Sequence, residues 1–274
     1  MRVISPAKLN LSLSVGSVRD DGFHQVDSFF HLLSLHDVLH LHPAFSFDFT
    51  SSLNLGIPDE DNLVVKAVKA MAELHNRELP ALHLKLEKHI PHGAGLGGGS
   101  SNAAAAIFAL SKLWDAQADD LKHLALAAEL GSDVPLFLAP TTASVMTGRG
   151  EILVQSRSPL QLEHILVIKP KDASSPTGAV YRAFDANPQP THSIDEWKNN
   201  LEPAAIAISP QTGEALDWLI KQRGVKVAQV AGSGSACWAY FATADDLECA
   251  AAAAQQRDYW FAKTSTVDVG ICLQ

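Results

Sequence analysis

The segment at residues 91–101, PHGAGLGGGSS, has the composition that most directly suggests chemistry. Five of the seven positions from 93 to 99 are glycine, which admits positive φ and lets another molecule approach the main chain. Apolar residues at helical spacing follow, so we expect a helix here, with Ser100 or Ser101 as its N-cap. A glycine loop that opens a helix is a candidate anion site, because free N–H groups and the helix dipole point the same way.

Several nucleotide-binding loops share the order of strand, glycine loop and helix, and residues 82–86 alternate as a strand should. The G-x-G-x-x-G match from Gly93 to Gly98 is weak support for a dinucleotide site, because Asp115 and Asp119 fall in a helix–turn region instead of ending a strand. The P-loop pattern lacks its lysine, and the protein-kinase loop joins two strands. The remaining alternative is a glycine turn that only packs a helix.

Two further charged residues lie where chemistry is possible. Residues 8–15 alternate between apolar and polar, which places Lys8 and Asn10 on one face of a strand. That face could equally be a solvent-exposed strand edge with a charged guard. Asp133 follows the helix stop at Gly131 and precedes Pro135, so it is a turn or cap residue or a catalytic acid.

Phe23 and His24 directly follow an Asp-Asp-Gly turn. They either end a hairpin with a packed aromatic ring or offer a stacking ring and a hydrogen-bonding ring to a nucleobase. A metal site at His36, His40 and His42 is disfavoured, because no acid or cysteine completes a ligand set in that strand-like segment.

Composition narrows the class of protein. The 274 residues are 47% hydrophobic and 19% charged, which suits a globular chain with a full core. The net charge of −9 argues against a general binder of nucleic acids or anionic membranes, although Lys88, His89 and His92 flank the glycine loop. Three unpaired-looking cysteines suit a reducing compartment. We find no signal peptide and no apolar run of membrane length, so we expect a cytoplasmic enzyme.

The second half of the chain alternates strands and helices. A proline-containing seam at residues 156–162 precedes a strand at 165–168 and a helix that Pro176 opens. We expect helices near 197–201 and 213–221, strands at 228–230 and 237–241 around a second glycine turn, a helix at 245–256 and a final strand at 264–269. This order predicts a ferredoxin-like layer.

Five ordered motifs resemble those of the GHMP-type small-molecule kinases, and specifically the members of the non-mevalonate isoprenoid pathway. The motifs are PAKLNL at residues 6–11, DGFH at 21–24, GLGGGSSNAA at 95–104, GSDVP at 131–135 and GSG at 232–234. The resemblance implies an α+β fold of two domains. Residues 1–158 would form an ATP-binding, ribosomal protein S5 domain 2-like domain, and residues 159–274 a ferredoxin-like domain, with the active site between them.

The resemblance also assigns roles by position. Lys8 and Asp133 match the catalytic pair. The loop that would cradle the ATP phosphates comprises Pro91, His92, Gly93, Ala94, Gly95, Leu96, Gly97, Gly98, Gly99, Ser100 and Ser101. Positions at the adenine end are Asn62, Leu63 and Lys88, and positions that contact the substrate are Asn10, Phe23, His24, Thr177 and Tyr181. Phe23 stands where the family commonly has tyrosine, and it keeps the stacking face.

The implied reaction transfers a phosphoryl group from ATP to the C2 hydroxyl of a cytidine diphosphate-linked polyol. Asp133 would accept the hydroxyl proton, and Lys8 would stabilise negative charge on the attacking oxygen. Mg²⁺ should accompany ATP, and Ser100 or Ser101 could reach the ion. The sequence does not indicate a set of acidic ligands for it. The alternatives are a GHMP kinase of the homoserine or mevalonate type, and a nucleotide-binding protein without catalysis. We expect a monomer or homodimer.

Overall fold

The computed structural model describes residues 1–54, 56–116 and 121–274, and a long hairpin runs through its centre. Strand β1 (Arg2–Val18) pairs antiparallel with β2 (His24–Pro43), and the Asp-Asp-Gly turn joins them as predicted. These strands belong to a seven-stranded sheet of order β11-β1-β2-β4-β3, with β5 and β6 attached beside β2. The other strands are β3 (Asp48–Ser51), β4 (Leu82–Glu87), β5 (Ala143–Thr147), β6 (Ile152–Ser156) and β11 (Cys272–Leu273).

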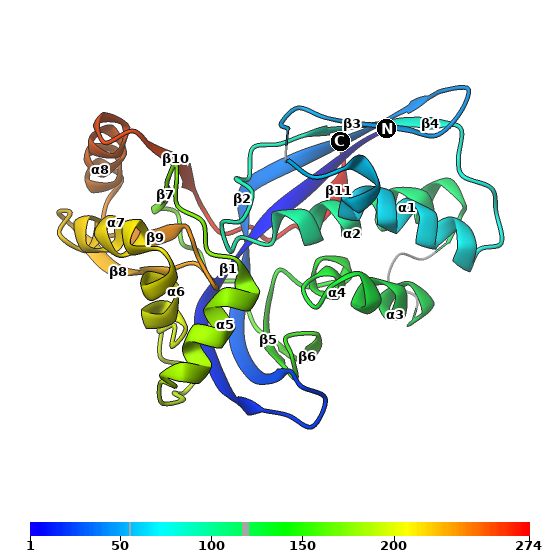
Figure 1. Cartoon of the computed structure of the whole chain (residues 1–274). Coiled ribbons are helices and arrows are strands. Elements are labelled where there is room, and N and C mark those ends of the chain that lie inside the picture. The colour runs from blue at the N-terminus through cyan, green and yellow to red at the C-terminus, as the bar shows by residue number, and fades with distance from the viewer. Residues whose placement is uncertain (55, 117–120) are drawn as a thin grey trace.

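The helices of the first half gather beside this sheet, at the right of Figure 1. They are the 3₁₀ turn η1 (Asp59–Asp61), α1 (Leu63–Leu74), α2 (Gly98–Leu113), α3 (Leu121–Leu130) and α4 (Val134–Leu138). Helix α1 begins directly after Asn62, because the Asn62 side chain accepts a hydrogen bond from the Val64 amide and caps the helix. Asp119, which the sequence places in a helix–turn region, lies outside the described residues.

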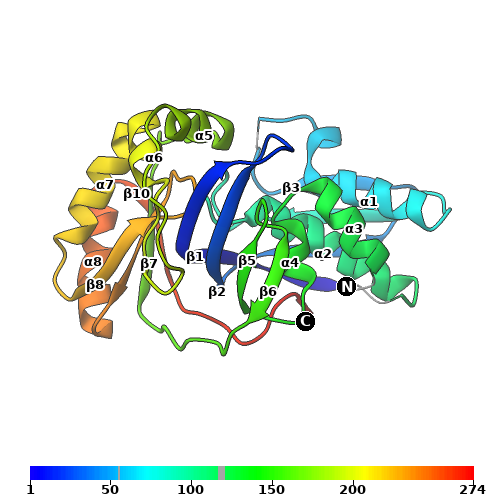
Figure 2. The ribbon, with the colours of Figure 1, turned by 90° about the horizontal axis from the view of Figure 1, so that it is seen from below.

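The second half forms a four-stranded antiparallel sheet of order β10-β7-β9-β8. Its strands are β7 (Ile165–Pro170), β8 (Val225–Val230), β9 (Cys237–Phe241) and β10 (Tyr259–Thr264), and its helices are α5 (Thr177–Ala186), α6 (Glu202–Ile208), α7 (Pro210–Ile220) and α8 (Ala244–Gln256). This order confirms the ferredoxin-like layer, which Figures 1 and 2 show beside the long hairpin.

Two predicted elements of this half are wrong. Residues 197–201 hold no helix, because the Asn199 and Asn200 side chains bond to main chain and α6 begins only at Glu202. The predicted strand at 264–269 is in fact β10, which ends at Thr264. The chain then returns to the first sheet, where β11 pairs with β1. The domain boundary at residue 158 stays a prediction.

Strand β1 is buried on both faces, which corrects the alternative of a solvent-exposed edge. Leu9 and Leu11 on one face pack in the same apolar cluster as Val167 and Trp238 of the second sheet. Lys8 on the other face is only 6% exposed. The hairpin therefore joins the two sheets through its apolar face and presents its polar face elsewhere.

The two glycine-rich turns contact each other through their main chains. The Ser235 amide donates to the Gly93 carbonyl at 3.1 Å, and the Ala236 amide lies 3.4 Å from the Ala94 carbonyl. A Cβ atom at Gly95, whose φ is +76°, would overlap the carbonyl oxygen of Ala231. Only glycine permits this approach.

The contact predicts different costs for two alanine substitutions. Gly93 also has positive φ, at +63°, but a Cβ atom there would meet nothing within 4 Å. We expect Gly93→Ala to lower the free energy of unfolding by roughly 1 kcal/mol, the cost of a left-handed alanine. Gly95→Ala should cost about 2 kcal/mol more, as overpacking does. Urea unfolding of both variants checks this, and equal costs would contradict the contact.

Candidate active site

A cavity of about 750 Å³ lies where the glycine loop, the long hairpin and α5 meet. The predicted site residues that line it are Lys8, Asn10, Phe23, His24, Asn62, Leu63, Lys88, Pro91, His92, Gly93, Ala94, Gly95, Leu96, Gly97, Gly98, Gly99, Ser100, Asp133, Thr177 and Tyr181. Ser101 does not line it, because its fully buried hydroxyl accepts a hydrogen bond from Ser5 at 2.8 Å. The structure thus brings together every predicted site residue except Ser101.

Helix α2 begins earlier than predicted. Its N-cap is Gly97, in the left-handed region at φ +69°, and not Ser100 or Ser101. The physical reason is that glycine alone adopts this conformation without strain, so the helix starts as soon as the loop allows it. No side chain caps α2. The first amides of the helix therefore stay available to an anion in the cavity, as a phosphate site requires.

Lys8, in β1, and Asp133, directly before α4, lie close together in the fold. The Lys8 Nζ atom lies 3.4 Å from Asp133 Oδ2 and donates to Asn10 Oδ1 at 2.6 Å. Asp133 precedes α4 without capping it, so its carboxylate is not engaged by the helix. The Lys8 main chain also holds the loop, because its amide donates to the Leu96 carbonyl at 2.9 Å. An ammonium and a carboxylate thus meet beside the glycine loop.

The aromatic end of the cavity is built by the hairpin turn and α5. The rings of His24 and Tyr181 lie 5.0 Å apart between centroids. Burial, together with the Asp133 carboxylate, raises the pKa of Tyr181 to about 12, so its hydroxyl stays protonated at neutral pH. Phe23 is 49% exposed, and the Arg149 guanidinium lies 5.1 Å from its ring centroid. Two aromatic faces therefore border one part of the cavity.

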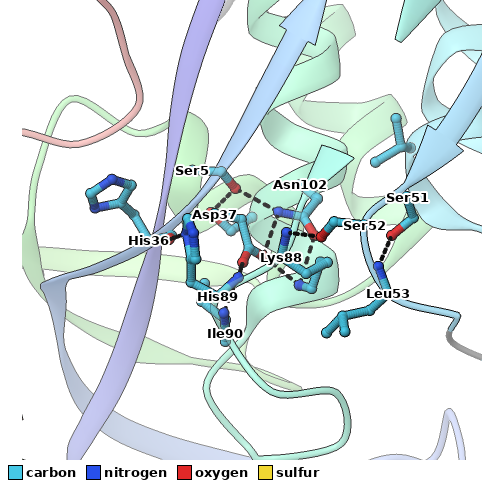
Figure 3. Close-up of polar contacts among 12 residues, drawn as sticks. Ser5, His36, Asp37, Ser51, Ser52, Leu53, Lys88, His89, Ile90 and Asn102 are labelled. Atoms are coloured by element: carbon cyan, nitrogen blue, oxygen red, sulfur yellow. Dashed lines mark hydrogen bonds and ion pairs between the residues drawn. The ribbon is translucent and has the colours of Figure 1, made fainter. Parts of the chain in front are cut away.

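Lys88 has more partners than its predicted place at the adenine end suggests (Figure 3). Its buried ammonium pairs with Asp37, which is fully buried, and donates to Asn102 Oδ1 at 3.1 Å. Asp37 also accepts hydrogen bonds from the main-chain amides of His89 and Ile90, at 2.7 and 2.8 Å. The side-chain amide of Asn102, through Nδ2, also donates a hydrogen bond to Asp37, at 2.9 Å. This network fixes β2, the start of the glycine loop and the first turns of α2 to one another.

Sequence reasoning missed several residues of the site. In the sequence Asp37 is a single acid within an apolar strand. Its role as the partner of a buried ammonium becomes visible only when the fold brings Lys88 beside it. Asp185 was not assigned to the site, but α5 continues to Ala186 and carries it to the cavity. Its spacing of four residues from Tyr181 is the signal that could have found it. Other cavity residues that were not assigned to the site include Asn102, Arg149, Ser175, Arg182, Gly232, Ser233 and Gly234.

Within the described residues there is no group of three or more histidine, cysteine or acidic side chains that could hold a metal ion. The rings of His40 and His42 stack at 6.2 Å, and His40 Nε2 lies 3.2 Å from Glu87. The three cysteines are free. None of the described helices is both long enough and apolar enough to span a bilayer.

The chain is similar to a family of known proteins. Residues 62–140 match the model of the GHMP kinases N terminal domain. The chain is 33% identical to the 4-diphosphocytidyl-2-C-methyl-D-erythritol kinase of Mesorhizobium japonicum over 95% of its own length and 94% of that protein. It is 39% identical to the enzyme of that name from Caulobacter vibrioides, over 90% and 91% of the two chains.

Solved structures show the same fold. A crystal structure of 4-(cytidine 5'-diphospho)-2C-methyl-D-erythritol kinase superimposes with a TM-score of 0.78 at 31% identity, covering 97% of this chain and 100% of that one. The mevalonate kinase of Methanococcus jannaschii gives 0.71 at 13% identity, covering 98% of both chains, which shows the fold alone.

The two sheets and the glycine loop that opens α2 thus define a small-molecule kinase of the GHMP class. The length and level of the identity narrow the class further. The chain belongs to the 4-diphosphocytidyl-2-C-methyl-D-erythritol kinase family.

The buried network around Asp37 predicts a non-additive effect on stability. Asp37→Asn and Lys88→Met should each lower the free energy of unfolding by about 3 kcal/mol, because each leaves a buried partner uncompensated. The double variant should cost less than the sum, since it removes both charges together. Urea unfolding of the four proteins measures the difference.

The matched control is Glu248→Gln, which breaks the exposed ion pair with Lys263 at 2.7 Å. It should change the free energy by less than about 1 kcal/mol. Additive costs at Asp37 and Lys88 would show that the two side chains are not coupled.

Proposed function

We propose that this protein phosphorylates the C2 hydroxyl of 4-diphosphocytidyl-2-C-methyl-D-erythritol with ATP, giving the 2-phosphate and ADP. The observation that carries the proposal is the meeting of Lys8 and Asp133, 3.4 Å apart, at a cavity that the uncapped start of α2 also lines. A proton acceptor, a cation and free amides are the parts that phosphoryl transfer to an alcohol needs. The family membership supplies the substrate.

In the proposed step the C2 oxygen attacks the γ-phosphorus of ATP. The new bond joins that oxygen to phosphorus, the bond from phosphorus to the bridging oxygen of ADP breaks, and Asp133 takes the hydroxyl proton. The Lys8 ammonium stabilises the negative charge that develops on the attacking oxygen. Asn10, which accepts the hydrogen bond from Lys8 at 2.6 Å, keeps the ammonium in place.

The nucleotide would bind along residues 91–100. The amides that open α2 and the helix dipole suit the phosphates. Asn62 and Leu63, at the start of α1, border the same cavity and would line the adenine end. The Lys88 ammonium lies against Gly98 of the loop, but Asp37 matches its charge, so the proposal assigns the phosphates chiefly to the amides of α2.

Mg²⁺ belongs to the proposal through ATP. The Ser100 hydroxyl lines the cavity at the first turn of α2, and a hard oxygen donor suits Mg²⁺ that otherwise binds phosphate and water. When bound, the ion would neutralise charge on the phosphates. Ser101 is not part of this set, because its hydroxyl is bonded to Ser5.

The substrate would fill the aromatic end. Phe23 and Tyr181 would stack on the cytosine ring, His24 would bond its edge, and Thr177 would contact the polyol diphosphate. The Thr177 hydroxyl lies 3.1 Å from the Ser233 hydroxyl of the second glycine turn. In this proposal Phe23 and His24 come from the first half of the fold, and Thr177 and Tyr181 come from the second. Cytoplasmic location and a monomeric or dimeric state stay predictions of the sequence.

Removing the proposed base tests the mechanism. We expect Asp133→Asn to lower kcat by about 10²–10⁴, the contribution of a general base, while the KM for ATP stays nearly unchanged. ADP release in the presence of ATP, Mg²⁺ and the cytidyl substrate measures both constants. Asp195→Asn, which changes an exposed acid paired with Arg157, serves as the control. Unchanged turnover in the Asp133 variant would remove this residue from the mechanism.

The aromatic end separates this proposal from the alternative kinases. A double variant, Phe23→Ala with His24→Ala, removes a stacking face and a hydrogen bond, so the KM for the cytidyl substrate should rise at least ~10-fold. The KM for ATP should not change. If the wild type instead phosphorylates homoserine or mevalonate, or releases no ADP with the cytidyl substrate, a different member or a binding protein is indicated.

A further inference from the structure

Asp185 lines the cavity but has no role in the proposed reaction. Its Oδ1 atom lies within hydrogen-bond distance of His24 Nε2, at 2.7 Å, although the two residues lie 161 positions apart in the chain. Asp185 belongs to α5, one helical turn after Tyr181, whereas His24 begins β2. The bond therefore ties the first sheet to the second half of the fold at the aromatic end of the cavity.

This bond decides which nitrogen of the His24 ring carries the proton. An ionised carboxylate only accepts hydrogen bonds, so in the neutral ring Nε2 must be the protonated nitrogen and Nδ1 an acceptor. Among the described residues, no hydrogen bond reaches Nδ1 of His24. The ring is 9% exposed and lies beside the rings of Tyr181 and Phe184, at 5.0 and 6.0 Å between centroids. Its orientation is therefore fixed as well as its tautomer.

We propose that Asp185 is a positioning residue that makes the cavity select cytosine over uracil, by holding His24 as a hydrogen-bond acceptor. The inference rests on the proposed function, which places the pyrimidine between Phe23 and Tyr181. It adds a residue and a chemical reason to that function, because a histidine alone can present either a donor or an acceptor to a base.

The two pyrimidines differ in the atoms that an acceptor can use. The hydrogen-bonding edge of cytosine has a single donor, the exocyclic amine, besides the acceptors N3 and O2. Uracil carries an oxygen in place of the amine, and its edge donor is the N3–H group one position along. An Nδ1 lone pair placed for the amine thus meets a second lone pair in uracil. A hydrogen-bonding site rejects an analogue that leaves its buried group unpaired.

The tautomer can be measured without any turnover. Long-range ¹H–¹⁵N spectra of ¹⁵N-histidine-labelled protein, with the His24 signals identified by their loss in His24→Gln, report which ring nitrogen is protonated. We expect Nε2 to carry the proton of the neutral ring in the wild type. In Asp185→Ala both tautomers should be populated, because the carboxylate no longer holds the proton. A neutral ring protonated at Nδ1 in the wild type would overturn the proposal.

Substrate preference is the second readout. The ratio of kcat/KM for the cytidine-bearing substrate to that for its uridine analogue should fall roughly tenfold in Asp185→Ala, the factor that one hydrogen bond contributes. Asp185→Asn should retain a larger part of the ratio, since its amide oxygen can accept the same hydrogen bond. Because each ratio compares two substrates in one protein, a general loss of stability does not move it.

The control variant is Glu248→Ala, which also removes a carboxylate paired across an exposed surface, on α8. It should leave both the ratio and the His24 spectrum unchanged. A wild-type ratio that persists in Asp185→Ala would overturn the role of Asp185 alone. Absence of ADP release by the wild type with the cytidine-bearing substrate would instead reject the proposed function, while the spectra would still report the tautomer.

Discussion

The main-chain contact between the two glycine turns is the constraint on which the rest of the structure depends. Gly95 packs against the Ala231 carbonyl so closely that no side chain fits, and the Ser235 amide bonds to the Gly93 carbonyl at 3.1 Å. The glycine loop is thereby held by the second half of the fold as well as by β1. A loop rich in glycine would otherwise lose much conformational entropy on ordering, so these bonds are what give it one shape.

Strand β1 links the position of the glycine loop to the position of the Lys8 ammonium beside Asp133. Its amide at Lys8 bonds to the Leu96 carbonyl, and the Lys8 stem lies so close to Gly97 that a Cβ atom there would come within 2.8 Å of Lys8 Cγ. The same side chain ends 3.4 Å from Asp133. Lys8 therefore contributes both a main-chain hydrogen bond to the loop and an ammonium group beside it. A shift of the loop would move Lys8 relative to Asp133.

The sequence predicted those features of the fold that depend only on residues close together in the chain. The Asp-Asp-Gly turn closes the hairpin, because it needs only its neighbours in the chain. It did not predict Asp37, whose partners lie 51 to 65 positions away, nor the helical residue Asp185 beside His24. The cap of α2 was placed wrongly because serine is the stronger cap by propensity, whereas the left-handed Gly97 starts the helix earlier. The convergence of Lys8 and Asp133 came from the family resemblance, since their local patterns fit a strand edge and a turn.

Several side chains at the cavity are paired with residues from distant parts of the chain or shifted by their surroundings. The Tyr181 hydroxyl has its pKa raised to about 12 by burial and by the Asp133 carboxylate, so the ring beside the acid stays neutral when the acid is charged. The Lys88 ammonium is matched by Asp37, and His24 by Asp185. Lys88 and His24 thus each have a carboxylate partner from a distant part of the chain. Under the proposed function the polyphosphate would rely chiefly on the uncapped amides of α2, because the Lys8 and Lys88 ammonium groups are already paired with carboxylates, and the base would rely on stacking and directed hydrogen bonds.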